Sequence, residues 1–311
     1  MRLVFMGSPD FAVPALNALA TAGHEIIGVF SQPDKPRGRG KELAPTAVKK
    51  AALELGLDVF TPTSVRTPEV YETLKNLAPE MIVVVAYGKI IPKEILELPP
   101  YGCINVHASL LPAYRGAAPI HRAIINGDGI TGVTTMHMGV GLDTGDMIYC
   151  TEVLISKKDT VGTVHDKLAI SGAALIVLTL EALKKGVAPR IPQDDSLATY
   201  APLLSKADEE LDWSQSASEI VNRVRGMNPF PGTFTLFRGE ILKTLEAEAE
   251  ELVEHAQPGR VLTADVKKGL LVACGKGAVW LKEVQAKSGK RMSGDAFVRG
   301  YKVSEGEILK R

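Results

Sequence analysis

The residue types best suited to chemistry stand in the segment 105–116, NVHASLLPAYRG. The segment begins within a β-prone run, 102–107, and on a strand residues two apart face the same side. Asn105 and His107 can therefore point together into one cleft, where an amide and an imidazole could stabilise a developing oxyanion and move a proton. Taken alone, His107 also fits a structural role as a strand-end histidine with satisfied hydrogen bonds.

A third polar group comes from the glycine-rich loop 138–146, MGVGLDTGD, which follows another β-prone run. Such a loop can carry Asp143 against the imidazole and orient it. Asp143 or Asp146 could equally cap the backbone of a plain turn. Together the two segments offer an amide, an imidazole and a carboxylate without an obvious nucleophile. That combination fits direct transfer of a one-carbon or acyl group better than a covalent relay.

These segments resemble the signature of the folate-dependent formyltransferases. The motifs are NVHASLLPAYRGAAPIHRAIINGD and GLDTGDM, and further similar stretches run along nearly the whole chain: SQPDKPRGRGKELAPTAVK, VVVAYGKIIP, LLSKADEELDWS, VRGMNPFPGTFT and GKRMSGDAFVRG. The resemblance implies transfer of formyl from the cosubstrate 10-formyltetrahydrofolate to the amino group of methionine on initiator methionyl-tRNA, for bacterial translation initiation. It implies no metal.

The same resemblance implies roles for particular residues. Asn105, His107 and Asp143 match the family's catalytic trio. The pterin is expected to meet backbone near 85–88 and 139–143 as well. The folate-binding stretch of the family is matched by Ser109, Leu110, Leu111 and Pro112.

The loop 35–41, KPRGRGK, has four cations in seven residues and no acid. By itself this composition also suits a solvated loop. In the resembling family the corresponding loop enters the acceptor-stem region of tRNA, so its cations are expected to contact phosphate or open the terminal pair. The residues expected to contact tRNA are Arg37, Arg39, Lys41 and Lys206.

The elements that must position these groups alternate between strand and helix. Strands are expected at 2–6, 24–31, 81–86, 102–107 and 132–138, and helices at 10–22, 46–55, 118–125 and 160–185. This order predicts an α/β fold, a doubly wound, mostly parallel, Rossmann-like sheet that binds ligands at the carboxyl ends of its strands. The turn Gly7-Ser8-Pro9 lacks the later glycines of G-x-G-x-x-G and no P-loop motif occurs, which argues against a nicotinamide cofactor and nucleotide hydrolysis.

The length of 311 residues suggests about two domains. We expect a catalytic domain at 1–188, a breaker-rich linker at 189–207 and a smaller C-terminal domain at 208–311. Beyond a helix at 218–225, short strands at 233–237, 261–263, 270–273 and 278–282 suggest a small β-barrel or sandwich, and we expect a barrel of the oligonucleotide-binding (OB) type. From 260 to 302 ten Lys and Arg stand against three acids, a balance of +7, whereas 240–254 holds six acids and one lysine. The basic stretch suits RNA binding.

Composition narrows the class of protein without naming a partner. Thirty-six Lys and Arg balance thirty-six Asp and Glu, and 45% of residues are hydrophobic, so a folded chain without a global charge field is expected. Cys103, Cys150 and Cys274 have no disulfide or zinc-site spacing, which favours reduced, mostly buried thiols. Without a signal peptide or membrane span, a cytoplasmic protein is the default expectation. Without a coiled-coil heptad or an obvious assembly segment, a monomer is the default oligomeric state.

Two other functions remain open from the sequence. A formyltransferase acting on a sugar-nucleotide amine would have similar catalytic residues, but it needs no basic loop such as 35–41. A non-catalytic RNA-binding protein would not require Asn105, His107 and Asp143 together.

Overall fold

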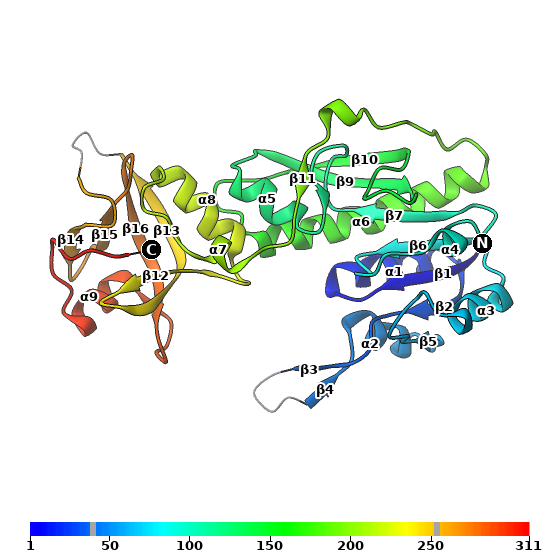
Figure 1. Cartoon of the computed structure of the whole chain (residues 1–311), viewed down its shortest axis with the longest axis horizontal. Coiled ribbons are helices and arrows are strands. Elements are labelled where there is room, and N and C mark those ends of the chain that lie inside the picture. Colours follow the sequence, from blue (N-terminus) through cyan, green and yellow to red (C-terminus); the bar gives the residue numbers. More distant parts are fainter. Residues whose placement is uncertain (38–41, 252–255, 311) are drawn as a thin grey trace. The chain divides into compact units, whose positions relative to one another are not determined.

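The computed structural model describes residues 1–37, 42–251 and 256–310, and the chain divides into two compact units (Figure 1). Unit 1 comprises Met1–Pro119, Ile130–Leu154 and His165–Ala201. Unit 2 comprises Ile120–Gly129, Ile155–Val164 and Pro202–Arg311. Two short segments from within the expected catalytic domain, 1–188, therefore pack with the C-terminal part of the chain.

Unit 1 is built on a seven-stranded sheet in the order β10-β9-β7-β6-β1-β2-β5. Neighbouring strands from β7 to β5 are parallel, whereas β9 and β10 are antiparallel to their neighbours. The predicted mostly parallel α/β sheet is confirmed, with two antiparallel strands at one edge. The strands are β1 (Arg2–Gly7), β2 (Glu25–Phe30), β5 (Val59–Phe60), β6 (Met81–Val85), β7 (Cys103–His107), β9 (Ile130–His137) and β10 (Met147–Leu154).

Helices cover both faces of this sheet, as a doubly wound fold requires. On one face, Gly172 of α6 lets the helix approach Val106 and Val133, because a Cβ at this position would lie 3.0 Å from the Val106 side chain. On the other face, α3 and α4 contribute to a cluster of buried residues with β1, β2 and β6. The helical elements are η1 (Asp10–Ala12), α1 (Val13–Thr21), α2 (Ala47–Glu54), α3 (Pro68–Leu77), α4 (Lys93–Leu96), α6 (Val161–Lys184) and η2 (Asp195–Leu197).

Two short ribbons complete unit 1. β3 (Lys35–Arg37) and β4 (Glu42–Ala44) pair antiparallel, so the first three residues of the segment interpreted as a basic loop form a strand. β8 (Arg115–Gly116) pairs parallel with β11 (Tyr200–Ala201), which belongs to the segment interpreted as a linker. The chain therefore returns to the end of β7 before it leaves unit 1.

Unit 2 contains an antiparallel sheet in the order β12-β13-β16-β15-β14, with β17 paired to β16. Its buried cluster includes Trp213, Ile220 and Phe297. The expected barrel is not confirmed: among the described residues, Leu236 and Arg260 pair with the C-terminal segment only through isolated bridges. The elements are α5 (Pro119–Ile125), α7 (Lys206–Glu209), α8 (Ala217–Met227), β12 (Thr233–Phe237), β13 (Glu240–Glu250), β14 (Val261–Asp265), β15 (Gly269–Ala273), β16 (Ala278–Ala286), β17 (Met292–Ser293) and α9 (Gly294–Tyr301).

The three cysteines are free thiols, of which two are buried and Cys150 is exposed. Burial raises the pKa of both Cys103 and Cys274 to about 12, which makes them poor nucleophiles. Within the described part of the chain, no helix is long and apolar enough to cross a membrane.

Candidate active site

A buried histidine at the end of β7 is contacted at both ring nitrogens. His107 is 6% exposed, and its Nε2 lies 3.0 Å from the carbonyl oxygen of Tyr114. A carbonyl oxygen only accepts, so Nε2 donates this hydrogen bond. The other nitrogen, Nδ1, lies 3.7 Å from Oδ2 of Asp143. The structure thus brings together two of the three residues expected to be catalytic.

Asn105, the third expected catalytic residue, precedes His107 by two positions on β7 and is half-buried. Both side chains therefore leave the same face of the sheet. No group in the described ranges 1–37, 42–251 and 256–310 hydrogen-bonds to the Asn105 amide. The amide is available to a ligand beside His107.

Asp143 is held by backbone in an unusual conformation. Its φ of 52° is left-handed, which is uncommon for a residue other than glycine. Its Oδ2 accepts a 2.8 Å hydrogen bond from the Gly116 N–H, on the strand that follows the Tyr114 carbonyl. Two residues further on, Gly145 lies against the His137 carbonyl so closely that a Cβ there would overlap it. This glycine lets the loop 138–146 turn where Asp143 can meet His107.

A second histidine, His137, lies beside this loop at the end of β9. Burial, assisted by the positive charge of Arg190, lowers the pKa of His137, and Asp146 opposes the shift. His137 is therefore neutral at pH 7. His107, not His137, is the imidazole that faces the Asp143 carboxylate.

The loop after β6 is fixed by two side chains that the sequence analysis did not single out as ligands. Ser8 Oγ donates to the Tyr87 carbonyl at 3.3 Å, and Gln32 Nε2 donates to the carbonyls of Tyr87 and Gly88 at 3.0 and 3.3 Å. These residues follow β1 and β2, and their position directly after strands is the signal that could have found them. Beside them lies a cavity of about 450 Å³ lined by Ser8, Pro9, Asp10, Gln32, Pro33, Lys35, Pro36, Ala44, Pro45, Thr46, Ala47 and Ala86.

The stretch expected to bind folate uses two of its side chains inside the protein. Ser109 is fully buried and its Oγ donates to the Ala113 carbonyl at 2.6 Å, while Leu111 is 7% exposed. Leu110 and Pro112 are half-buried. A ligand can therefore reach this stretch through its backbone and through Leu110 or Pro112, but not through the Ser109 hydroxyl as it stands.

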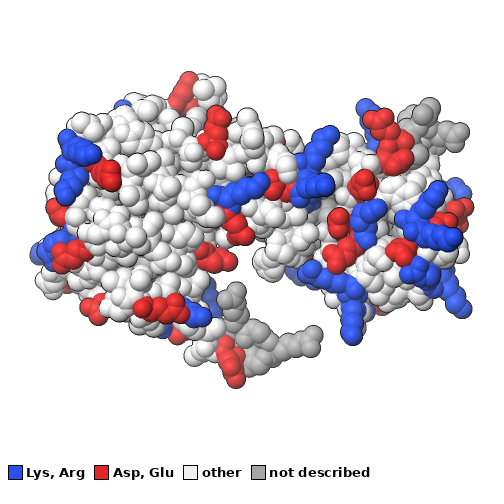
Figure 2. Space-filling model, turned by 180° about the vertical axis from the view of Figure 1, so that it is seen from behind, with Lys and Arg blue, Asp and Glu red and all other residues white. Residues whose placement is uncertain are grey.

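Of the residues expected to bind tRNA, the structure describes the surroundings of one. Arg39, Lys41 and the side chain of Arg37 lie outside the described residues. Lys206 is exposed at the first position of α7, in unit 2. Lys and Arg side chains also gather over unit 2 on the face shown in Figure 2, with acidic side chains among them.

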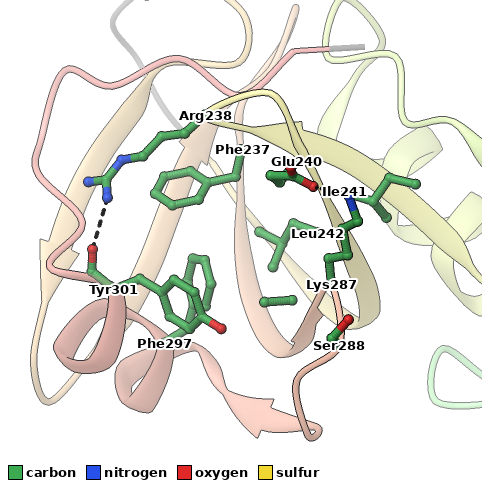
Figure 3. A pocket seen from close by; sticks show the side chains of 10 residues that line it. Phe237, Arg238, Glu240, Ile241, Leu242, Lys287, Ser288, Phe297 and Tyr301 are labelled. Carbon is green, nitrogen blue, oxygen red and sulfur yellow. Dashed lines mark hydrogen bonds and ion pairs between the residues drawn. The ribbon is translucent and has the colours of Figure 1, made fainter.

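Unit 2 has a cavity of its own, of about 350 Å³ (Figure 3). Phe237, Phe297 and Tyr301 form one side, and Arg238 reaches from the rim to the Tyr301 carbonyl at 3.1 Å. Both rim cations are neutralised, Arg238 by Glu307 at 2.8 Å and Lys287 by Glu240 at 2.7 Å. Within the described ranges, no group of three or more His, Cys, Asp or Glu side chains could hold a metal ion.

The fold and site define a class of protein. A mostly parallel α/β sheet carries a buried imidazole and a carboxylate beside a free amide, and an antiparallel domain follows it. The sequence matches the family described as "Formyl transferase" over residues 1–180 and "Formyl transferase, C-terminal domain" over residues 203–302. The chain belongs to the formyl transferase family.

Full-length relatives define the branch of that family. The chain is 52% identical over 311 residues to a protein of Desulforamulus reducens named methionyl-tRNA formyltransferase, covering 99% of this chain and 98% of that protein. It is 50% identical over 309 residues to the protein of that name from Moorella thermoacetica, covering 99% of each chain. By this similarity the chain falls in the methionyl-tRNA formyltransferase branch.

Solved structures share the fold at much lower identity. An N-formyltransferase from Helicobacter canadensis, solved with folinic acid and dTDP-3-aminofucose, matches with a TM-score of 0.66 and 16% identity over 92% of this chain and 99% of that one. HypX from Aquifex aeolicus, solved with tetrahydrofolic acid, matches with a TM-score of 0.62 and 17% identity, over 99% of this chain and 48% of that one. At these identities the matches establish the fold alone.

Proposed function

We propose that this protein transfers the formyl group of 10-formyltetrahydrofolate to the free amino group of methionine on initiator methionyl-tRNA. The observation that carries the proposal is the contact between His107 and Asp143 at the end of β7, 3.7 Å from Nδ1 to Oδ2. The named full-length relatives support tRNA as the acceptor, and the two solved relatives with folate compounds support the donor.

In the proposed mechanism, the methionine amine attacks the formyl carbon while negative charge develops on the formyl oxygen. Asn105 and protonated His107 donate hydrogen bonds to that oxygen, since hydrogen bonds aimed at a developing oxyanion lower the barrier. For this, the Nε2–H of His107 exchanges its bond to the Tyr114 carbonyl for one to the formyl oxygen, while Nδ1 stays beside Asp143. Asp143 orients His107 and helps to pass the proton that leaves the amine to the folate nitrogen that carried the formyl group. The bond between that nitrogen and the formyl carbon then breaks, and tetrahydrofolate leaves. Placing the two substrates side by side supplies a further part of the rate enhancement.

The donor is expected to lie against backbone. Ser109, Leu110, Leu111 and Pro112 would contact folate, with 85–88 and 139–143 beside the pterin. The available Asn105 amide and the partly exposed Leu110 and Pro112 fit a ligand here. No step of the proposed reaction uses a metal.

We propose that the acceptor tRNA is bound by four basic residues, Arg37, Arg39, Lys41 and Lys206. The proposed division is a catalytic domain at 1–188, a linker at 189–207 and a tRNA-binding domain at 208–311. The cations of unit 2 suit the phosphate backbone. We further propose that the protein acts in the cytoplasm as a monomer.

The test is formyl transfer from 10-formyltetrahydrofolate to charged initiator methionyl-tRNA, with free methionine and a sugar-nucleotide amine as parallel acceptors. We expect transfer to the tRNA alone. Transfer only to the sugar nucleotide would be consistent with the proposed roles of Asn105, His107 and Asp143, but it would refute the proposal that tRNA is the acceptor. Binding of tRNA without transfer to any acceptor would indicate a non-catalytic RNA-binding protein.

A further inference from the structure

One side chain from the segment that follows α6 connects to the loop that carries Asp143. Gln193 Nε2 donates to the carbonyl oxygens of Asp143 and Gly145, both at 2.8 Å. Its Oε1 accepts from Nε and Nη2 of Arg115, at 3.0 and 2.9 Å. Gln193 thus joins the loop 138–146 to the strand β8, and both belong to unit 1.

Arg115 fixes which way the Gln193 amide points. Its side chain is 2% exposed, and it also contacts Asp195, 2.7 Å from Nη2 to Oδ1. A guanidinium only donates and a carbonyl only accepts, so the Gln193 oxygen must face Arg115 and its NH₂ group must face the loop. The partners of this amide therefore determine its orientation without ambiguity.

The two carbonyls that Gln193 holds lie at Asp143 itself and two residues beyond it. Between them the chain leaves the left-handed conformation of Asp143, whose φ is 52°. The same carboxylate accepts from the N–H of Gly116, next to Arg115 in the sequence. Asp143 is thereby held through its backbone by Gln193 and through its side chain by Gly116.

We infer that Gln193 is a positioning residue for the reaction, acting through Asp143 to keep that carboxylate against His107. This inference rests on the proposed function for the role of Asp143. In the proposed reaction Gln193 contacts neither the methionine amine nor the formyl group. A substitution of Gln193 must therefore have no effect on kcat when the Asp143 carboxylate is absent. That dependence separates positioning from a general contribution to folding.

The substitution Gln193→Glu tests the inference with little change in size. The new carboxylate still accepts from Arg115, but its second oxygen faces the carbonyls of Asp143 and Gly145 and cannot donate to them. The matched control is Gln285→Glu in unit 2, where the amide likewise donates to a backbone carbonyl, that of Gly289, at 2.8 Å. Both variants lose an amide donor and gain one negative charge.

In steady-state formyl transfer, we expect Gln193→Glu to lower kcat about ten- to a hundredfold, the loss typical of a misplaced catalytic group, while the KM for tRNA stays within about twofold. Gln285→Glu adds its charge in the proposed tRNA-binding domain, so it can change the KM for tRNA but should leave kcat unchanged. In the Asp143→Ala background, Gln193→Glu should have no further effect on kcat. Additive losses in the double variant, or an unchanged kcat in Gln193→Glu, would overturn the inference.

A second measurement does not depend on activity. Amide hydrogen exchange at Gly116 reports on its bond to Asp143, while the neighbouring amides of Arg115 and Ala117 bond to backbone of the segment 199–201 and serve as internal controls. We expect Gln193→Glu to speed exchange at Gly116 alone, to the rate found in Asp143→Ala. Unchanged exchange at Gly116 contradicts the inference even if transfer occurs. If wild type transfers no formyl but exchange responds as expected, the proposed function fails and the positioning of Asp143 stands.

Discussion

Backbone groups hold both ionisable side chains at the end of β7. The His107 ring donates to the Tyr114 carbonyl, and the Asp143 carboxylate accepts from the Gly116 amide. Both backbone groups lie in one short stretch, 114–116, so a single piece of chain orients the imidazole and the carboxylate. Substitutions of His107 or Asp143 should therefore reduce formyl transfer while leaving the backbone of 114–116 in place.

Replacing His107 by alanine is expected to lower kcat for formyl transfer about 10²- to 10⁴-fold, the usual contribution of a positioned general acid or base. Binding of tRNA should be unchanged, because the proposed tRNA contacts lie elsewhere. Single-turnover transfer and filter binding measure the two effects separately. His165→Ala is the control, since that half-buried ring pairs with Asp166 at 2.9 Å in the same unit. Full activity of His107→Ala would contradict the assignment.

At this scale the sequence predicted part of the site. Asn105 and His107 stand two apart on a recognisable strand, and Asp143 stands in a glycine-rich loop, so periodicity and motif are enough to find them. Gln193 gives no such signal, because it lies in an aperiodic segment and contacts a carbonyl 50 positions away. The sequence places Arg115 in a motif but does not show its partners, because Gln193 and Asp195 lie about 80 positions further along the chain.

Among the elements, β13 shows why some of the fold was missed. Its residues read EILKTLEAEAE, and Ala and Glu favour helices in isolation. The strand forms because β12 and β16 pair with it on either side, with Leu242 and Thr244 buried and Glu246 and Glu248 exposed. Such long-range pairing is not encoded in local propensity. Four of the six acids in the stretch 240–254, Glu240, Glu246, Glu248 and Glu250, are exposed on this strand.

In the loop between β9 and β10, two glycines should differ in how much stability is lost when each is replaced by alanine. Gly145→Ala should destabilise the fold by about 1–3 kcal/mol and reduce transfer, because the new Cβ overlaps the His137 carbonyl and the loop must move. Gly139→Ala should leave stability within about 0.5 kcal/mol, since nothing lies within 4 Å of its Cβ position. Thermal unfolding compares the two variants, and equal losses would refute this account.

In unit 2 an ion pair between α5 and α7 should make stability depend on pH. The hydrogen bond from Arg122 Nη1, 2.6 Å from the carboxylate of Asp208, lowers the pKa of that carboxyl to about 2. A lowered folded-state pKa contributes stability above the unfolded pKa near 3.8, and the contribution is lost as pH falls toward 2. Asp208→Asn should thus cost about 2 kcal/mol at pH 7.

The measurement is thermal unfolding of wild type and Asp208→Asn between pH 7 and pH 2. The difference in Tm should be constant down to about pH 4 and shrink below it. Glu72→Gln is the control, because its exposed pair with Lys75, at 3.8 Å, should contribute little at any pH. A difference in Tm that does not change with pH would show that charge is not the cause.

For the molecule as a whole, charge is arranged locally and not globally. Positive and negative residues are equal in number, yet four cations stand together at 35–41 and others gather over unit 2 (Figure 2). A polyanion would therefore bind through particular surfaces. Counting charges in the sequence could predict these clusters, but not the antiparallel pairing of β3 with β4.

Replacing Arg37 and Arg39 together by glutamine is expected to weaken tRNA binding about tenfold or more and to flatten its dependence on salt concentration. Affinity for 10-formyltetrahydrofolate should stay within about twofold. Lys75→Gln with Lys93→Gln removes the same charge from exposed helices and serves as the control. Binding titrations across a series of salt concentrations measure both ligands, and an equal effect on the two would contradict the role of the loop.

The pairing of β11 with β8 means that the elements around the candidate site are synthesised one after another. During synthesis Asp143 leaves the ribosome 50 residues before Gln193, and the partner strand Tyr200–Ala201 comes later still. A nascent chain that ends at residue 180, where the match to the formyl transferase domain ends, holds Asn105, His107, Asp143 and the Gly116 amide. It lacks Gln193, which bonds to the carbonyls of Asp143 and Gly145 in the loop 138–146. The contacts that hold the candidate active site can therefore all form only after the segment 193–201 has been synthesised.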